Sequence, residues 1–538
     1  MNPHRRKLLL RSAAALAATA VCGPAFAIGG DDTSSPNLHI ELSAGLDEIA
    51  IRPGAKTRVW RYRAKLLAGA PAALDTSMLA PIIRVHRGQR IRVDLINDLP
   101  ESTIIHWHGL HVPEDMDGHP RFAIAPGERY RYVFTVRNRA GSYWFHPHPH
   151  GRTGKQVYAG LAGLFLVSDD DEAALALPSG AFDMPLVIQD RNFDQDNQLV
   201  YPGGAMAAAP QGGGMMGGRM GSMMGGTGGT GGMGGGMAGM MGVLGDTILV
   251  NGAPDVLRPV ERKAYRIRLF NACNTRTLKL AWSDNTAMQV IASDGGLLDA
   301  PVQRDYVMLA PAERVELWVD FSRWPTGATP VLASQAFDTG MGMGSMMRTM
   351  MGGDNALANG AAFPVCRFKI ASAAIAGPAM PQRLTPIAPP QDRLAVNADR
   401  PKVFELTMGM MRWGINGQSF DMLAASDLET VKLGTQEIWE FRNDGGAMMG
   451  MTMPHSMHIH GLQFRVIGRT ISSSRARGYD TVKAGLVDGG WKDTVLVMPG
   501  ERVRVLLRFE DFTGLFLYHC HMLEHEDIGM MRNYRVVA

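Results

Sequence analysis

One turn-and-strand unit occurs three times along the 538 residues of this chain, and it constrains the fold more than any other feature. Each copy has the sequence Pro-x-Glu-Arg followed by alternating apolar and polar residues, and a shorter alternating run that ends in Asn lies upstream. Alternation with a period of two is typical of β-strands, and regular repetition indicates homologous units. The sequence therefore predicts an all-β chain of three consecutive sandwiches. The turns are Pro126-Gly127-Glu128-Arg129, Pro311-Ala312-Glu313-Arg314 and Pro499-Gly500-Glu501-Arg502.

Composition indicates where these units join and reveals two unusual segments inside the second. Stretches rich in Ala, Pro and Asp separate the domains that we expect at 36–170, 180–373 and 398–538. The segment 206–241 holds ten methionines among many glycines, and the loop 341–351 holds six more. Because glycine at this density prevents a packed element, we predict that 206–241 is a flexible insert of the second domain.

The first 27 residues have the pattern of an export signal. Arg5-Arg6 precedes an apolar run from Ala13 to Val21, and Ala25-Phe26-Ala27 matches a cleavage site. The run is shorter than the roughly 20 residues that span a bilayer, and the arginine pair favours the twin-arginine route over the Sec route. We therefore expect a periplasmic protein without a membrane span. The net charge is only +3, with four basic residues inside the signal, so no nucleic-acid partner is expected.

Metal-binding side chains are concentrated in four short motifs, and no histidine occurs between His150 and His455. In an extended chain residues i and i+2 share a face, so each HxH motif presents two imidazoles on one side. Four such pairs can converge on one cavity, whereas Cys520, between the histidines of the last pair, faces the other way. Two imidazoles, a thiolate and a weak thioether form the donor set of a blue-copper centre. The HxH pairs are 106/108, 146/148, 458/460 and 519/521, and the second set is His455, Cys520, His525 and Met530.

Two other interpretations of these histidines exist. Isolated histidines are common in protein cores and on surfaces, and imidazole also binds zinc. Four HxH motifs confined to the first and third repeats argue against scattered structural histidines. Eight imidazoles beside a Cys/His/His/Met set favour copper over zinc.

The four motifs, in this order, resemble those of the three-domain multicopper oxidases, whose domains are cupredoxin-like Greek-key β-sandwiches. The resemblance implies four copper ions and the reduction of O₂ to two waters by four one-electron oxidations. It places type 1 copper on His455, Cys520, His525 and Met530, type 2 copper on His106 and His458, and the type 3 pair on His108, His146, His148, His460, His519 and His521. It also implies that Asp117 and Glu526 move protons near the cluster. The alternatives are a turn carboxylate for Asp117 and a solvated loop acid for Glu526.

The methionines suggest the reducing substrate. Thioethers are soft ligands that prefer Cu(I), although Met/Gly tracts are also ordinary flexible loops. The pattern resembles the periplasmic copper-efflux branch, the cuprous oxidases, but Met451 stands where that branch has an aspartate. We predict a cuprous oxidase that contributes to copper tolerance, with O₂ and Cu(I) or small organic reductants as partners, and a monomeric protein. A laccase-like oxidase of phenols and a non-enzymatic copper-storage protein remain alternatives. Candidate Cu(I) ligands are Met341, Met343, Met346, Met347, Met451 and Met453.

Two further cysteines, Cys273 and Cys366, both lie in the second repeat. They can form a disulfide if their Cα atoms lie within about 7 Å, or remain as buried thiols. The sequence favours neither state, and neither cysteine matches a ligand position of the family.

Overall fold

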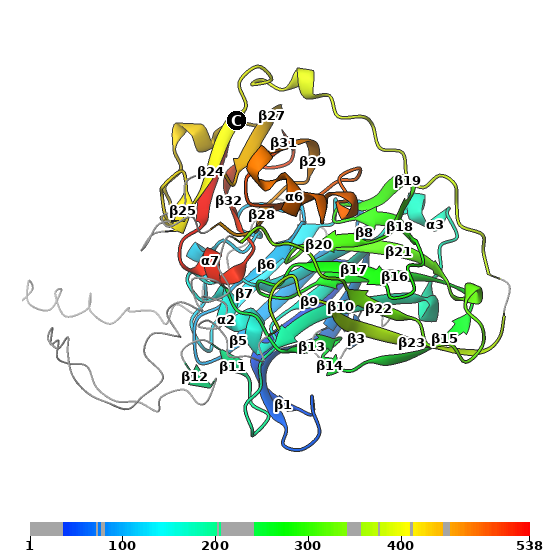
Figure 1. Ribbon diagram of the computed structural model, residues 1–538. Helices are drawn as coiled ribbons and strands as arrows, with labels where there is room; N and C mark the ends of the chain where they lie inside the picture. The colour runs from blue at the N-terminus through cyan, green and yellow to red at the C-terminus, as the bar shows by residue number, and fades with distance from the viewer. Residues whose placement is uncertain are drawn as a thin grey trace, which may run out of the picture.

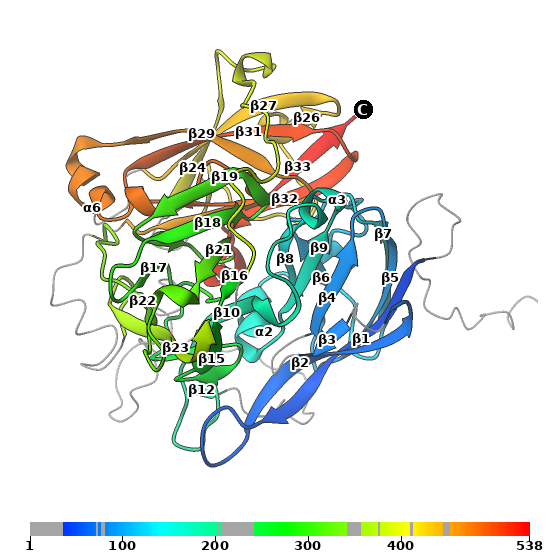
Figure 2. The same cartoon turned by 90° about the vertical axis from the view of Figure 1, so that its right-hand side faces the viewer.

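Strands dominate the computed structural model, which confirms the all-β prediction. It describes residues 36–70, 74–76, 81–201, 204–205, 242–341, 357–374, 377–408, 413–444 and 452–538. Three predicted segments lie outside these ranges: the signal 1–27, the insert 206–241 and residues 342–351, which include Met343, Met346 and Met347. Met451 also lies outside them. In Figure 2 the third domain, coloured yellow to red, lies above the blue-to-cyan first domain and the green second domain.

The first domain is a sandwich of two sheets. The alternating burial of β1 shows why: Leu38, Ile40 and Leu42 face the core, and the residues between them are partly exposed. Trp107 lies in the same buried cluster. One sheet has the order β2 (Thr57–Ala68), β1 (Leu38–Ile49), β5 (Arg90–Asp98) and β7 (Arg129–Thr135). The other has the order β3 (Leu74–Thr76), β4 (Pro81–His86), β9 (Gly163–Ser168), β8 (Gly141–Pro147) and β6 (Ile105–His108).

The second domain packs a larger sheet against a smaller one around a core that contains Trp282 and Phe321. The larger sheet runs β14 (Ala253–Pro254), β13 (Thr247–Val250), β10 (Asp183–Arg191), β16 (Ala264–Asn271), β21 (Arg314–Asp320), β18 (Met288–Ser293) and β19 (Gly296–Arg304). The smaller runs β15 (Leu257–Arg262), β23 (Phe363–Ala374), β22 (Val331–Ser334), β17 (Leu278–Trp282) and β20 (Val307–Leu309). A separate pair joins β11 (Val200–Tyr201) to β12 (Gly204–Ala205).

The third domain again has two five-stranded sheets, and Trp439 and Tyr518 lie in the core between them. One sheet runs β25 (Trp413–Ile415), β24 (Lys402–Met408), β27 (Thr435–Arg442), β31 (Glu501–Phe509) and β29 (Phe464–Ile471). The other runs β26 (Thr430–Lys432), β33 (Met531–Val537), β32 (Gly514–Cys520), β28 (His455–Ile459) and β30 (Thr494–Val497).

The helices of the described ranges are short. The α-helices are α2 (Thr153–Ala159), α3 (Asp170–Ala173), α6 (Ala476–Asp480) and α7 (Leu523–Asp527). Single 3₁₀ turns are η2 (Pro120–Phe122), η3 (Gly180–Phe182), η4 (Phe321–Arg323), η5 (Asp392–Leu394), η6 (Asp427–Glu429), η8 (Ser473–Arg475) and η9 (Lys483–Gly485). No helix in the described part of the chain is long and apolar enough to span a membrane. Figure 1 shows α7 at the edge of the third domain that faces the first domain.

The three repeats make equivalent contacts. The glutamate of each Pro-x-Glu-Arg turn accepts a 2.7 Å hydrogen bond from the main-chain NH three residues earlier. The asparagine at or next to the end of the upstream strand is buried in every copy, and its Nδ2 donates to two main-chain carbonyls. These asparagines are Asn97, Asn271 and Asn443. Both residues of the repeat therefore stabilise the turns at strand ends.

Candidate metal centre

Two pairs of antiparallel strands bring the HxH motifs together. In the first domain His106 of β6 is the register partner of His146 of β8. In the third domain His458 of β28 is the register partner of His519 of β32. The second histidine of each motif follows on the same face, and all eight imidazoles are at most 1% exposed. Side chains from the two ends of the chain thus meet between the first and third domains.

The ring nitrogens of these histidines face one another at distances that suit bound metal ions. His106 Nε2 lies 3.3 Å from His458 Nε2, and His146 Nε2 lies 3.4 Å from His521 Nε2. His519 Nε2 lies 3.0 Å from the Nε2 atom of His460 and 3.4 Å from that of His148. Two nitrogens bound tetrahedrally to one metal ion at about 2.0–2.1 Å are about 3.3 Å apart. The donor set therefore fits transition-metal ions shared between the two domains.

Hydrogen bonds on the outer side of the rings determine which nitrogen is available. The Nδ1 atom of His106 donates to the Asp117 carbonyl at 2.7 Å, and that of His460 donates to Asp117 Oδ2 at 2.7 Å. His458 Nδ1 donates to the Asp493 carbonyl at 2.7 Å. An acceptor on Nδ1 places the proton there and leaves Nε2 as the ligand atom. These three histidines consequently offer Nε2 to a metal.

His108 has the opposite arrangement. Its Nε2 atom lies 3.0 Å from Asp493 Oδ1 and 3.0 Å from Thr494 Oγ1. Its Nδ1 atom is buried and has no hydrogen-bond partner among the described residues. An unpartnered buried nitrogen is costly unless it binds something else. His108 would therefore offer Nδ1 to a metal ion, a choice that the HxH spacing alone does not make.

Cys520 lies at a second group of donors, as the alternation along its strand predicts. Its Sγ atom is 3.4 Å from His455 Nδ1 and 3.6 Å from His525 Nδ1, and all three residues are buried. Met530 is also buried, and its main chain pairs with Cys520 and with His525. Burial raises the pKa of the Cys520 thiol to about 12 and lowers that of His455 to about 3. A cation here would stabilise the thiolate that burial disfavours.

Both candidate substrate methionines within the described ranges belong to, or pack against, the apolar core of the third domain that also contains Cys520. Met453 is 3% exposed and belongs to the same apolar cluster as Cys520 and Met530. Met341 of the second domain is partly buried and packs against this cluster. The remaining candidates lie in the ranges that the structure does not describe.

The two proposed proton carriers are both buried, and each contacts histidines of the HxH cluster. Glu526 Oε2 lies 3.1 Å from His519 Nδ1, and its Oε1 lies 3.5 Å from His148 Nε2. Burial raises the pKa of Glu526, but the neighbouring His148 and His519 bring it well below its usual value. Burial holds the pKa of Asp117 well above its usual value. Glu526 is only 1% exposed, so the alternative of a solvated loop acid is wrong.

The helix α7 carries two acids that sequence reasoning missed. The Glu524 carboxylate accepts hydrogen bonds from side chains and from a main-chain NH of the second domain. The Asp527 carboxylate accepts from Thr153 N at 2.8 Å and from Gly154 N at 2.9 Å. Their neighbour His525 lies beside Cys520, while Glu526 contacts the HxH cluster. Four consecutive residues thus face four different surroundings. Only their position next to a predicted ligand could have drawn attention to them.

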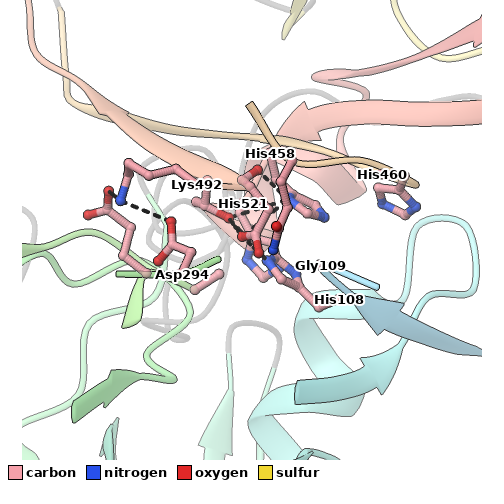
Figure 3. Close-up of polar contacts among 12 residues, drawn as sticks. His108, Gly109, Asp294, His458, His460, Lys492 and His521 are labelled. Carbon is pink, nitrogen blue, oxygen red and sulfur yellow. Dashed lines mark hydrogen bonds and ion pairs between the residues drawn. The ribbon is translucent and has the colours of Figure 1, made fainter. Parts of the chain in front are cut away.

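A buried charge network behind His108 was also missed. Arg314 binds Asp493, and Lys492 Nζ lies 2.9 Å from Asp294 Oδ2 and 3.1 Å from Glu313 Oε1. Figure 3 shows Lys492 and Asp294 on the side of His108 and His458 away from His460. The repeated Pro-x-Glu-Arg turn contains Arg314, but the sequence does not show that this arginine is buried.

The second-repeat cysteines are both buried free thiols. Of the two states that the sequence left open, the structure therefore has the unlinked one. Burial raises the pKa of Cys366 to about 12 and holds that of Cys273 well above its usual value.

Comparison with known proteins agrees with this geometry. Residues 61–172 and 395–538 match the multicopper oxidase family. The chain is 30% identical to a laccase of Bacillus stratosphericus over 522 residues, which cover 88% of this chain and 90% of the laccase.

Solved structures give the same result. The McoA multicopper oxidase of the hyperthermophile Aquifex aeolicus is 33% identical, with a TM-score of 0.73 and coverage of 94% of this chain and 97% of that one. A multicopper oxidase of Campylobacter jejuni, described as a metallo-oxidase, is 25% identical with a TM-score of 0.68, covering 96% and 94%. Two imidazole-rich centres, three β-domains and these likenesses together show that the chain belongs to the multicopper oxidases, copper-binding oxidoreductases that pass electrons from a reducing substrate to O₂.

Proposed function

We propose that this protein is a cuprous oxidase, which couples four one-electron oxidations of Cu(I) to the reduction of O₂ to two waters and so contributes to copper tolerance. The observation that carries the proposal is the packing of Met341 and Met453 against the cluster that contains Cys520. Thioethers prefer Cu(I), and they persist in an oxidising compartment where thiols form disulfides. Substrate Cu(I) held there would lie on the same side of the molecule as the type 1 copper that we assign to Cys520, which would accept its electron.

We assign four copper ions to the chain, as the family resemblance implies. Bound copper would supply one-electron transfer and the binding of O₂. One ion would be held by His455, Cys520, His525 and Met530 as type 1 copper, one by His106 and His458 as type 2 copper, and two by His108, His146, His148, His460, His519 and His521 as the type 3 pair.

The chain itself provides the electron path and the proton carriers. Cys520 is covalently continuous with His519 and His521, so an electron delivered to a copper ion bound at its thiolate would reach both histidines through a few bonds. Asp117 and Glu526 are buried beside histidines that we assign as ligands, and we assign proton transfer to them. Separation of the two centres keeps the reductant away from O₂.

A test compares two substrates in two kinds of variant. Deletion of 206–241 and 341–351, or the volume-conserving pair Met341→Leu and Met453→Leu, removes thioethers without touching the assigned ligands. If the protein is a cuprous oxidase, both kinds of variant should lose Cu(I) oxidation and should keep or increase phenol oxidation. Both activities are measured as O₂ uptake. Equal Cu(I) turnover in wild type and variants would contradict the proposal.

Oxidation of phenols or other organic donors is the second candidate, since the Bacillus stratosphericus relative is a laccase. It predicts that phenol turnover exceeds Cu(I) turnover even in wild type. Copper storage, the third candidate, predicts no O₂ uptake with either donor.

We further propose that residues 1–27 direct export by the twin-arginine route, that the mature protein is a periplasmic monomer, and that its domains span 36–170, 180–373 and 398–538. Replacement of Arg5 and Arg6 by Lys should retain the protein in the cytoplasmic fraction. Sedimentation of the purified protein tests the monomer, and limited proteolysis tests the boundaries.

A further inference from the structure

The arginine of the repeated turn has a different environment in the second domain from that in the other two. The side chains of Arg129 and Arg502 are 49% and 48% exposed, whereas that of Arg314 is 0% exposed. The glutamate beside each arginine keeps the same turn contact in all three copies. The turn therefore does not require a buried arginine, and the burial of Arg314 needs another explanation.

All five N–H donors of the Arg314 guanidinium are used, and they reach every domain. Nη1 and Nη2 donate to Asp493 Oδ1 and Oδ2 at 2.7 and 2.6 Å, a bidentate pair with the third domain. Nε donates to the Ser142 carbonyl of the first domain at 2.8 Å. The remaining donors reach the carbonyls of Ala312 and Asp294 in the second domain, each at 3.0 Å. A planar, fully bonded guanidinium determines the plane of the carboxylate opposite.

Asp493 in turn holds one histidine from each ligand-bearing domain. Its Oδ1 accepts from His108 Nε2 at 3.0 Å and from Thr494 Oγ1 at 2.9 Å, and its carbonyl accepts from His458 Nδ1 at 2.7 Å. These bonds leave His108 Nδ1 and His458 Nε2 as the ligand atoms. Acceptors on the outer nitrogen of metal-bound histidines orient the ring and select the tautomer. Arg314 thus acts on both rings through a single residue.

The other charges of the network do not replace Arg314. Lys492 is occupied by Asp294 and Glu313, at 2.9 and 3.1 Å. Figure 3 shows the Lys492 ammonium turned toward Asp294, away from His108 and His458. Among the arginine and lysine ion pairs of the described residues, the one that involves the Asp493 carboxylate is made by Arg314.

We propose that Arg314 is a positioning residue for the HxH cluster, by which the second domain, without supplying a ligand, sets the orientation of His108 and His458. The inference rests on the proposed function, because it takes these histidines as copper ligands. It does not depend on whether Cu(I) or a phenol is the reductant.

The experiment starts with the copper-loaded wild type and compares Arg314→Met, Arg314→Lys and the matched controls Arg129→Met and Arg502→Met, which alter the exposed arginines of the same turn. Lysine keeps the charge but lacks the planar fork that binds both carboxylate oxygens. The readouts are copper affinity of the HxH cluster by chelator competition, the type 2 EPR signal, and the type 1 visible absorption.

In Arg314→Met we expect copper affinity at the HxH cluster to fall about 10- to 100-fold and the type 2 EPR parameters to change, with type 1 absorption retained. Arg314→Lys should show a smaller change of the same kind, and the control variants none. If Arg314→Met does not fold, the type 2 signal of Arg314→Lys decides. Wild-type affinity and EPR in a folded Arg314 variant would overturn the inference alone. A wild type that binds no copper would overturn it together with the proposed function.

Discussion

Glu524 directly precedes His525 in α7, yet its carboxylate lies among four donors of the second domain. Oε1 accepts from Asn274 Nδ2 at 2.8 Å and Tyr201 OH at 3.1 Å. Oε2 accepts from Thr275 Oγ1 at 2.8 Å and Val243 N at 3.2 Å. An ionised carboxylate has lone pairs for all four donors. One side chain thus ties the neighbour of a proposed copper ligand to a different domain.

Glu524→Gln should disturb the type 1 site. Whichever way the amide turns, its NH₂ meets either Asn274 Nδ2 or Val243 N, neither of which can accept a hydrogen bond. The unpaired buried donors should lower the free energy of unfolding by about 1–3 kcal/mol and shift the type 1 visible band. Glu501→Gln, a buried carboxylate bonded to Arg469 and to Met498 N, should lose stability without shifting the band. An unshifted Glu524→Gln band would refute the coupling.

Asp117→Ala and Glu526→Gln should slow O₂ reduction while copper remains bound. Each substitution removes a buried proton carrier but no assigned ligand, and such groups contribute about 10²- to 10⁴-fold to rates. Asp117→Asn keeps an oxygen that accepts from His460 Nδ1 but has no acidic proton. It therefore shows whether Asp117 acts by transferring protons or by orienting the His460 ring. Copper analysis with O₂ uptake tests this, and normal turnover in both variants would remove these residues from the mechanism.

Cys520→Ser should abolish the strong visible absorption of the oxidised protein. Serine nearly preserves the volume but removes the thiolate, the soft donor between His455 and His525. One copper ion should be lost, and O₂ uptake should stop, because the covalent link to His519 and His521 would no longer end at a metal. Retained colour would mean that the absorbing centre lies elsewhere.

Gly118→Ala should destabilise the turn that holds Asp117. Gly118 has φ +87°, and a methyl there would lie 2.7 Å from His106 Cα and closer still to the Ile105 carbonyl. Backbone strain and overpacking together should lower the free energy of unfolding by roughly 2–5 kcal/mol. Gly127→Ala is the matched control, because φ is +83° but no atom lies within 4 Å of the added methyl, so only the strain remains. Equal losses in denaturant unfolding would contradict the predicted clash.

The copper-free protein should lose stability as the pH falls. Burial lowers the pKa of His146 to about 3, of His148 to about 4 and of His455 to about 3. In an unfolded chain histidine has a pKa of about 6.5, so below that pH the unfolded state binds more protons than the native state. The free energy of unfolding should therefore decline from about pH 6.5 down to about pH 4, by up to about 1.4 kcal/mol per pH unit for each histidine. In denaturant titrations the copper-free His146→Gln variant should show a smaller slope.

The ligand motifs could be read from the sequence because a strand alternates with a period of two. That period is set by the backbone, so the pairing of imidazoles in HxH and the opposite direction of Cys520 follow from local geometry alone. The repeated turn likewise predicted three β-domains. Residues 206–241 and most of 341–351 lie outside the described residues, so their part in Cu(I) binding stays a prediction.

The surroundings of these ligands were decided by tertiary structure. Arg314 and Asp493 are 179 residues apart in sequence, and the arginine is buried where its counterparts Arg129 and Arg502 are half exposed. The choice of Nδ1 in His108, the buried state of Glu526 and the interdomain contacts of Glu524 depend in the same way on how the domains meet. The period of a strand determines which face of the sheet a side chain is on. Which residues of another domain contact that side chain depends on the packing of whole domains, which is the sum of many contacts.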